Sequence, residues 1–204
     1  MADAVTPIAV LLSGRGSNFV AIADAIDRGE IPARIVLVLS NIAGAGGIER
    51  ARERGLEAVE IPHKGMRRVA HEELVLEALR AAGAEWVCLA GYMRLLSPLL
   101  VRAYPRRIVN IHPSLLPAFP GLEAQRQALE WGVRVSGCTV HLVDEELDHG
   151  PIVVQRTVDV LPDDDAHRLA ARIIVEEHRA YPEALRLLLS DTWRLDGRRI
   201  VPKI

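Results

Sequence analysis

The sequence predicts a single-domain α/β fold with an open twisted sheet, parallel in its N-terminal half and mixed in its C-terminal half, and with helices on both faces. Strand-like apolar runs alternate strictly with helical patterns up to residue 108, which is typical of β-α-β units. The first run, residues 8–13, is almost wholly apolar, as in a central parallel strand. Residues 135–143 and 152–160 instead alternate in polarity around a short loop, which indicates an antiparallel pair. The expected arrangement is Rossmann-like.

The N-terminal elements follow from apolar periodicity and from glycine and proline punctuation. Strands are predicted at residues 8–13, 35–39, 58–61, 86–90 and 108–112, and helices at 20–29, 48–54 and 67–82. The third helix is expected to carry one apolar stripe, formed by Leu74, Leu76, Leu79 and Ala82. A further helix begins at Ser97-Pro98, because serine suits the cap and proline the first turn.

The C-terminal half contains a predicted helix at 123–131, the two antiparallel strands and a long helix within 163–190. The long helix is expected to bend or break near Pro182, because proline removes a backbone donor and clashes with the preceding turn. Asp196-Gly197 lies between two extended stretches, which is a strong signal for a β-hairpin. The expected organisation is one domain, 1–204, with halves at 1–108 and 109–204.

The composition excludes several classes of protein. The 204 residues include 25 basic and 27 acidic side chains, a balance that argues against broad electrostatic binding of nucleic acid. No apolar run approaches the roughly 20 residues that span a bilayer, and the N-terminus does not resemble a signal peptide. The two cysteines, Cys88 and Cys138, lie in apolar runs and are expected to be buried thiols. We therefore expect a soluble cytoplasmic protein.

The fifth predicted strand ends in the sequence Asn110-Ile-His112, followed by a proline-rich loop. Asn110 and His112 are two residues apart, so in an extended strand their side chains leave the same face. Ligands of open α/β sheets collect at the carboxyl ends of the strands, so the pair is a candidate catalytic edge. The alternative is a satisfied strand cap with a packed histidine.

Two other stretches carry possible chemistry. Residues 14–18, Gly-Arg-Gly-Ser-Asn, join the first strand to the first helix, a geometry that aims backbone N–H groups at an anion, with Ser17 as helix cap and further donor. The alternative is a tight glycine turn without a ligand. The acidic loop 144–150 is either a solvated surface loop or the source of a carboxylate that orients His112. Asp148 is the favoured carboxylate, but the sequence does not separate it from Asp144, Glu145 or Glu146.

The remaining candidates are weaker. Arg94 follows the end of the fourth strand among apolar residues, and either binds a ligand carboxylate or lies over the surface. Glu176, Glu177 and His178 on the long helix are solvated charges by default. A metal site is not expected, because His63, His71 and His141 have no Cys or acidic partner at metal-ligand spacing.

Four motifs together resemble the folate-dependent formyltransferases. They are SGRGSN at 13–18, LAGYMRLLSP at 89–98, NIHPSLLP with FPG at 110–121, and ELDHGPI at 146–152. They span nearly the whole chain in order, and the NIHPSLLP run is highly specific. The resemblance is to the branch of the family that acts on glycinamide ribonucleotide (GAR). It implies formyl transfer from 10-formyltetrahydrofolate, a co-substrate, to the amine of GAR in purine biosynthesis, without a metal.

The resemblance also implies roles for individual residues. The catalytic residues would be Asn110, His112 and Asp148. GAR would be bound by Gly16, Ser17, Asn18 and Glu177. Folate would be bound by Arg68, Met93, Arg94, Leu95, Leu96, Asn110 and Asp144. Residues 1–108 would then form the nucleotide-binding half and residues 109–204 the catalytic and folate-binding half. No nucleic-acid or membrane partner is expected, and the protein would be a monomer or a homodimer.

Three other functions remain as alternatives. Two belong to the same family, namely formylation of methionyl-tRNA and hydrolysis of formyltetrahydrofolate. Their usual additional RNA-contacting or regulatory domains are not expected within these 204 residues. The third is a nucleotide- or anion-binding module without catalysis, which the presence of Asn110, His112 and Asp148 disfavours.

Overall fold

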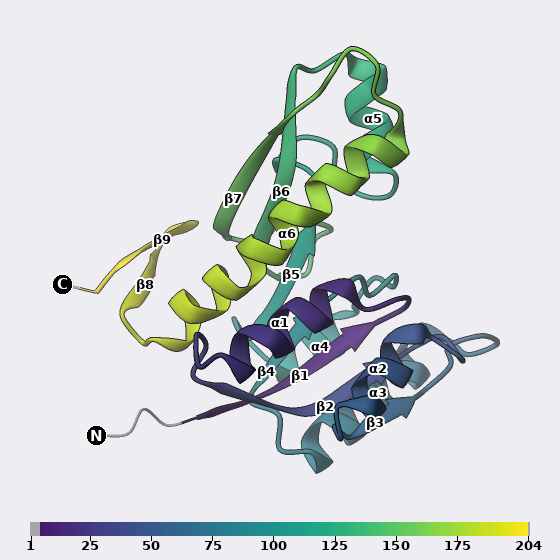
Figure 1. Cartoon of the computed structure of the whole chain (residues 1–204). Helices are drawn as coiled ribbons and strands as arrows, with labels where there is room; N and C mark the ends of the chain where they lie inside the picture. The colour runs from purple at the N-terminus through teal and green to yellow at the C-terminus, as the bar shows by residue number, and fades with distance from the viewer. Residues whose placement is uncertain (1–4, 204) are drawn as a thin grey trace. The chain divides into compact units, whose positions relative to one another are not determined.

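The computed structural model describes residues 5–203 and divides into two compact units, Met1–Val109 and Asn110–Ile204 (Figure 1). The strands of the first unit lie in the order β3-β2-β1-β4, and all their pairings are parallel. Its elements are β1 Thr6–Leu12, α1 Ser17–Asp27, β2 Ala33–Ser40, α2 Gly46–Glu53, β3 Ala58–Glu60, α3 Arg68–Ala81, β4 Trp86–Leu89 and α4 Pro98–Ala103. This is the parallel part predicted from the alternation of strands and helices.

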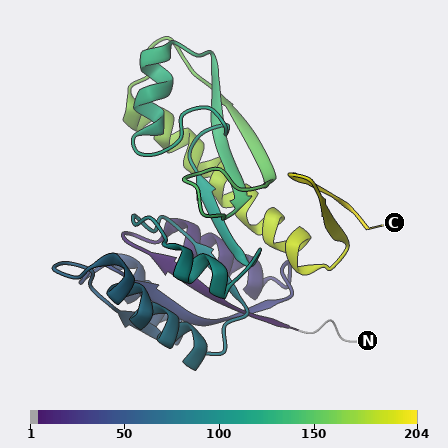
Figure 2. The same cartoon turned by 180° about the vertical axis from the view of Figure 1, so that it is seen from behind.

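The core of the first unit forms around β1. Every residue from Ile8 to Leu12 is fully buried, as expected for a strand with neighbours on both edges and helices on both faces. Helices α1 and α2 contact each other, and so do α3 and α4. Figure 1 shows the first pair toward the viewer, and the reverse view in Figure 2 brings the second pair forward.

The second unit contains a mixed arrangement. Strand β5, Ile108–His112, begins at the boundary of the two units, and the order beyond it is β5-β6-β7. The other elements are α5 Ala124–Trp131, β6 Val135–Leu142, β7 Ile152–Asp159, α6 Ala166–Leu189, β8 Trp193–Asp196 and β9 Arg199–Pro202. Strands β6 and β7 are antiparallel, α6 packs on both, and β8 and β9 form a separate two-stranded sheet.

These features confirm the predicted α/β fold class, with parallel strands followed by a C-terminal antiparallel pair. The hairpin signal at Asp196-Gly197 is also confirmed, with Gly197 in the turn at φ +59°. Helix α4 begins as predicted: Ser97 caps it by accepting a hydrogen bond from the Leu99 N–H, and Pro98 is its first residue.

Two local features differ from the prediction. Helix α6 does not break at Pro182, because its buried face, which includes Tyr181 and Leu185, holds it against β6 and β7 despite the missing N–H. On α3, Leu74 is 42% exposed and does not belong to the buried stripe. The buried face includes His71 and Glu72 instead, both almost inaccessible to solvent. Within residues 5–203, no helix has both the length and the apolar composition needed to cross a bilayer.

Candidate active site

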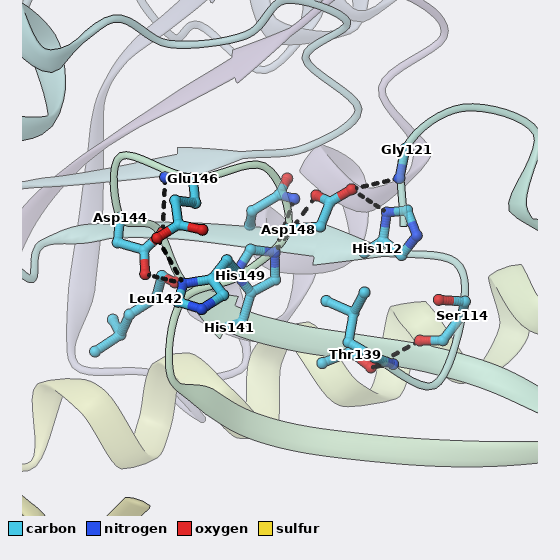
Figure 3. A network of polar contacts seen from close by, with 12 residues as sticks. His112, Ser114, Gly121, Thr139, His141, Leu142, Asp144, Glu146, Asp148 and His149 are labelled. Carbon is cyan, nitrogen blue, oxygen red and sulfur yellow. Dashed lines mark hydrogen bonds and ion pairs between the residues drawn. The ribbon is translucent and has the colours of Figure 1, made fainter. Parts of the chain in front are cut away.

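The second unit brings together Asp148 and His112, two of the three predicted catalytic residues (Figure 3). His112 ends strand β5, and Asp148 lies in the loop between β6 and β7. Asp148 Oδ2 is 3.4 Å from His112 Nδ1, and the two side chains are only 9% and 6% exposed. The same oxygen accepts a hydrogen bond of 2.8 Å from the Gly121 N–H. A buried carboxylate and an imidazole thus face each other directly.

The other acidic residues of the loop are used differently. Asp144 Oδ2 is 2.8 Å from His149 Nδ1, and its Oδ1 accepts a hydrogen bond from the Glu146 N–H. The Glu146 side chain is 76% exposed. Of the carboxylates that the sequence left open, Asp148 is the one that the structure places beside His112, whereas Asp144 organises the loop itself.

The direction of Asp148 depends on the backbone around it. Asp148 has φ +49°, a left-handed conformation that aspartate tolerates better than most residues. The loop closes with a hydrogen bond of 2.8 Å from the Leu142 N–H to the Pro151 carbonyl. At Gly150 a Cβ atom would lie 1.8 Å from the Leu142 carbonyl oxygen, so this position accepts only glycine. Gly150 and the closing hydrogen bond together turn Asp148 toward β5.

Both ring nitrogens of His112 face oxygen atoms. Nε2 lies 2.8 Å from the Phe119 carbonyl oxygen, which can only accept, so Nε2 carries a proton. Nδ1 faces the Asp148 carboxylate. His112 therefore lies between a backbone carbonyl oxygen and a buried carboxylate.

His141 on β6 is a site residue that the sequence reasoning missed. Its Nε2 lies 3.1 Å from Asn110 Nδ2, and its Nδ1 lies 3.0 Å from the Leu142 carbonyl oxygen. These two partners determine the tautomer of His141. Nδ1 donates to the Leu142 carbonyl oxygen, which can only accept, and Nε2 accepts from the Asn110 amide nitrogen, which can only donate. Burial lowers the pKa of His141, which favours this neutral form, although the Asp148 charge acts in the opposite direction. One N–H of the Asn110 amide is thereby donated to His141.

The available signal for His141 was a polar residue at an alternating position of a buried strand. That signal did not show which residue of β5 contacts His141, because the sequence of one strand does not determine its register with another strand distant in the chain. From the sequence, His141 was considered only as a metal ligand. Among the described residues, no three His, Cys, Asp or Glu side chains are grouped so as to hold a metal ion.

In the first unit, residues 13–16 form the predicted turn between β1 and α1. Gly16 has φ +73°, and a Cβ there would lie 2.9 Å from the Cα atom of Gly47. The Gly47 N–H donates to the Gly14 carbonyl at 3.0 Å, so two glycine backbones pack directly together. Gly16 is the cap residue and makes no side-chain cap, so the prediction that Ser17 caps the helix was wrong. Ser17 is instead the first residue of α1, and the buried Asn18 follows it.

Glu177 is also buried, with 8% exposure, on the face of α6 that packs against β6. Burial and, secondarily, the Glu177 charge raise the pKa of the Cys138 thiol to about 12. Glu176 contacts Arg156 and Arg179 at 3.4 and 2.6 Å. The default interpretation of this stretch as solvated helix charge was therefore wrong for both glutamates.

The candidate folate residues of the first unit lie on α3 and in the loop after β4. Arg68 is the exposed first residue of α3. In the loop, Met93 is 69% and Leu95 52% exposed, whereas Leu96 is half-buried. The Arg94 N–H donates to the Tyr92 carbonyl at 3.0 Å, which curls the chain between the two exposed apolar side chains.

The sequence of the chain is similar to proteins of one known family. The family model described as "Formyl transferase" matches residues 6–185. The phosphoribosylglycinamide formyltransferase of Escherichia coli K12 is 42% identical over 192 residues, which cover 94% of this chain and 88% of that protein. The trifunctional purine biosynthetic protein adenosine-3 of Drosophila pseudoobscura is 50% identical over 190 residues, 92% of this chain, but this match spans only 14% of that protein's length.

Solved structures agree with the sequence comparison. The crystal structure of glycinamide ribonucleotide transformylase 1 from Symbiobacterium toebii superimposes with a TM-score of 0.95 at 50% identity, covering 97% of this chain and 94% of that one. The matched region contains the strand with Asn110 and His112, the loop with Asp148 and the glycine turn after β1. This chain belongs to the formyl transferase family.

Proposed function

We propose that this chain is a phosphoribosylglycinamide formyltransferase, which transfers the formyl group of 10-formyltetrahydrofolate to the amine of GAR and releases formyl-GAR and tetrahydrofolate. The observation that carries the proposal is the cluster of buried His112, Asp148 and His141 with half-buried Asn110, on β5, β6 and the loop that follows. Membership of the family and the similarity to GAR-acting relatives support the same conclusion.

The first chemical requirement is stabilisation of negative charge. When the neutral amine attacks the formyl carbon, a C–N bond forms and the carbonyl oxygen becomes an oxyanion. A donor placed in advance at that oxygen typically contributes about 3–4 kcal/mol to lowering the barrier. The second N–H of the Asn110 amide is one such donor, since His141 holds the first. His112 Nε2–H supplies another when the oxyanion replaces or shares the Phe119 carbonyl as its acceptor.

The second requirement is transfer of a proton. The attacking amine must lose a proton, and the folate nitrogen must gain one as its bond to the formyl carbon breaks. Asp148 is within 3.4 Å of His112, and we assign it the relay of the amine proton, directly or through a water molecule. The Asp148 side chain is nearly buried, so bulk water screens its charge only weakly.

Binding roles complete the proposal. The turn at Gly16 leaves the backbone N–H groups of the first turn of α1 without a side-chain cap, which suits the phosphate of GAR, with Ser17, Asn18 and Glu177 as further contacts. The exposed apolar side chains of Met93 and Leu95 suit the flat ring of folate. Leu96, Arg94, Arg68, Asn110 and Asp144 complete the proposed folate set. We also retain the cytoplasmic location, consistent with two buried free thiols.

The test is a formyl transfer assay with purified chain, GAR and 10-formyltetrahydrofolate, following formyl-GAR by mass spectrometry. We expect turnover by the wild type and a loss of kcat of about 10²-fold or more for Asp148→Asn and His112→Ala, because each removes charge stabilisation at the reacting centre. Asp163→Asn and His167→Ala are matched controls at exposed positions and should leave kcat unchanged.

The same assay separates the alternatives. Release of formate without GAR would indicate a deformylase, and formylation of methionyl-tRNA in place of GAR would indicate the tRNA-directed enzyme. Binding of GAR and folate without turnover would indicate a non-catalytic module. Near wild-type kcat in a folded Asp148→Asn variant would refute the assigned role of Asp148.

A further inference from the structure

The stretch of residues 91–97, in the loop between β4 and α4, is held at one end by the half-buried Ser13 and at the other by the buried Glu72. We call it the 91–97 segment. It contains four of the proposed folate residues, and its exposed apolar side chains, Met93 and Leu95, follow the carboxyl end of a parallel strand. Ligands of open α/β sheets bind at that edge. A loop that recognises a flat ring must keep such side chains in place, because immobilising them on binding costs conformational entropy.

The N-terminal end of the segment is fixed to the end of β1. The Ser13 N–H donates to the Gly91 carbonyl at 3.1 Å, and the Met93 N–H donates to Ser13 Oγ at 2.7 Å. The Ser13 hydroxyl in turn donates to Asn41 Oδ1 at 2.5 Å. Three neighbouring strand ends, after β1, β2 and β4, are therefore linked through one serine hydroxyl.

The C-terminal end is fixed by Glu72 of α3. The Ser97 N–H donates to Glu72 Oε1 at 2.8 Å, and the Ser97 hydroxyl donates to Glu72 Oε2. Ser97 also accepts from the Leu99 N–H and so caps α4. Glu72 is 1% exposed and Ser97 4% exposed. A charged side chain that is buried so completely is uncommon. Both oxygens of Glu72 accept hydrogen bonds from a single residue of the loop, Ser97.

The residues that act electrostatically on Glu72's neighbourhood include two from the 91–97 segment, Tyr92 and Arg94. The charges of Glu72 and Arg94 both act on Tyr92, whose pKa is raised above its ordinary value chiefly by burial. Within residues 5–203, two buried polar atoms of the segment, Tyr92 Oη and Arg94 Nε, have no hydrogen-bond partner, and neither does Nδ1 of the adjacent His71. Buried polar atoms normally have partners, so these three atoms show that the interior at the 91–97 segment and at His71 is unusually polar.

We propose that Glu72 is a positioning residue for the folate co-substrate, because it fixes Ser97 and with it the conformation in which Met93, Arg94 and Leu95 meet the folate ring. The inference rests on the proposed folate-dependent transfer. Glu72 does not touch the reacting atoms. Its removal changes the affinity for folate and leaves the chemical step and the affinity for GAR as they are.

The experiment compares Glu72→Gln with Glu73→Gln, a matched substitution one residue further along α3 at an exposed position. Glutamine at position 72 has no charge and only one acceptor oxygen for the two donors that Glu72 receives on separate oxygens, and loss of a charge-assisted hydrogen bond corresponds to about a tenfold change in affinity. We expect the Kd for tetrahydrofolate, measured by titration calorimetry without GAR, and the KM for the formyl donor to rise about tenfold. Both kcat and the KM for GAR should stay within about twofold, and Glu73→Gln should match the wild type.

Two further variants keep the test decisive if Glu72→Gln does not fold. Ser97→Ala removes one hydroxyl and should weaken tetrahydrofolate binding, whereas Ser97→Thr keeps the hydroxyl and should restore it. Unchanged tetrahydrofolate binding in Glu72→Gln or Ser97→Ala would overturn the inference, as would equal changes in kcat and in both KM values. A wild type that binds tetrahydrofolate in a Glu72-dependent way but forms no formyl-GAR would contradict the proposed function and leave the inference intact.

Discussion

At the scale of single residues, the position of the Asp148 carboxylate depends on the absence of a Cβ atom at Gly150. The backbone there passes so close to the Leu142 carbonyl oxygen that a Cβ atom would lie 1.8 Å from it. The contact involves backbone on both sides, so no side-chain rotation relieves it. The chain would have to open the Leu142–Pro151 hydrogen bond that closes the loop.

We therefore predict that Gly150→Ala lowers the free energy of unfolding by about 3 kcal/mol, because the strain and the broken hydrogen bond add. Urea unfolding of the purified variant measures the change. Gly46→Ala is the matched control: an added Cβ there meets nothing closer than 4.0 Å, and alanine favours a helix start. A loss below about 1 kcal/mol at Gly150 would show that the loop moves freely.

Part of the site was predictable from single residues and their spacing. Asn110, His112 and Asp148 were identifiable from their motifs, and the spacing of the first two follows from the period of a strand. Asp148 was favoured by its motif, but residue types alone did not separate it from Asp144, because the difference depends on a left-handed backbone at Asp148 and on the closure at Gly150. His141 was not identified, because its partner Asn110 lies 31 residues away on a different strand.

At the scale of elements, helix α3 shows why apolar periodicity alone misplaced a buried face. The residues that face inward include His71 and Glu72. His71 Nε2 hydrogen-bonds to the Ile61 carbonyl oxygen, and Glu72 accepts from the Ser97 N–H. A buried face that accepts partnered polar residues is rotated from the stripe that leucines alone suggest. Leu74 falls outside it and Leu79 remains within it. A hydrophobic pattern therefore predicts the wrong orientation for a helix whose buried face includes polar residues.

This difference gives a matched pair on one helix. Leu79 is fully buried and Leu74 is 42% exposed. We predict that Leu79→Ala lowers the free energy of unfolding by about 2–5 kcal/mol, through lost burial and a cavity, and that Leu74→Ala changes it by about 0.5 kcal/mol or less. Chemical denaturation of both variants under the same conditions checks this. Equal losses at the two positions would mean that α3 packs in the orientation predicted from the sequence.

At the scale of the whole chain, the fold class was predictable because each strand and helix carries its own local signal. Continuous apolar strands such as β1 indicate parallel pairing, and alternating strands such as β6 indicate the antiparallel pair. Strand order and the continuity of α6 through Pro182 were not predictable in the same way. They depend on packing between segments that are distant in the sequence, and packing overrides local propensity.

Buried histidines in both units make a prediction about the stability of the whole chain. Burial is the main cause that lowers the pKa of His71 in the first unit and of His141 and His178 in the second, below the ordinary value of 6.5. Well above pH 6.5 these rings are neutral whether the chain is folded or unfolded. Below it the unfolded chain takes up protons that the folded chain does not, so stability decreases as the pH falls toward the lower folded pKa values.

We expect the free energy of unfolding to be constant between about pH 8 and 7 and to decrease from about pH 6.5 to 5.5, before most carboxylates begin to titrate. Urea unfolding across this range provides the measurement. His178→Gln removes one of the three groups and should reduce the slope, whereas His167→Gln, at an exposed position, should leave it unchanged. Stability that rises or stays level as the pH falls through this window would mean that the three rings accept protons in the folded chain as readily as in the unfolded one.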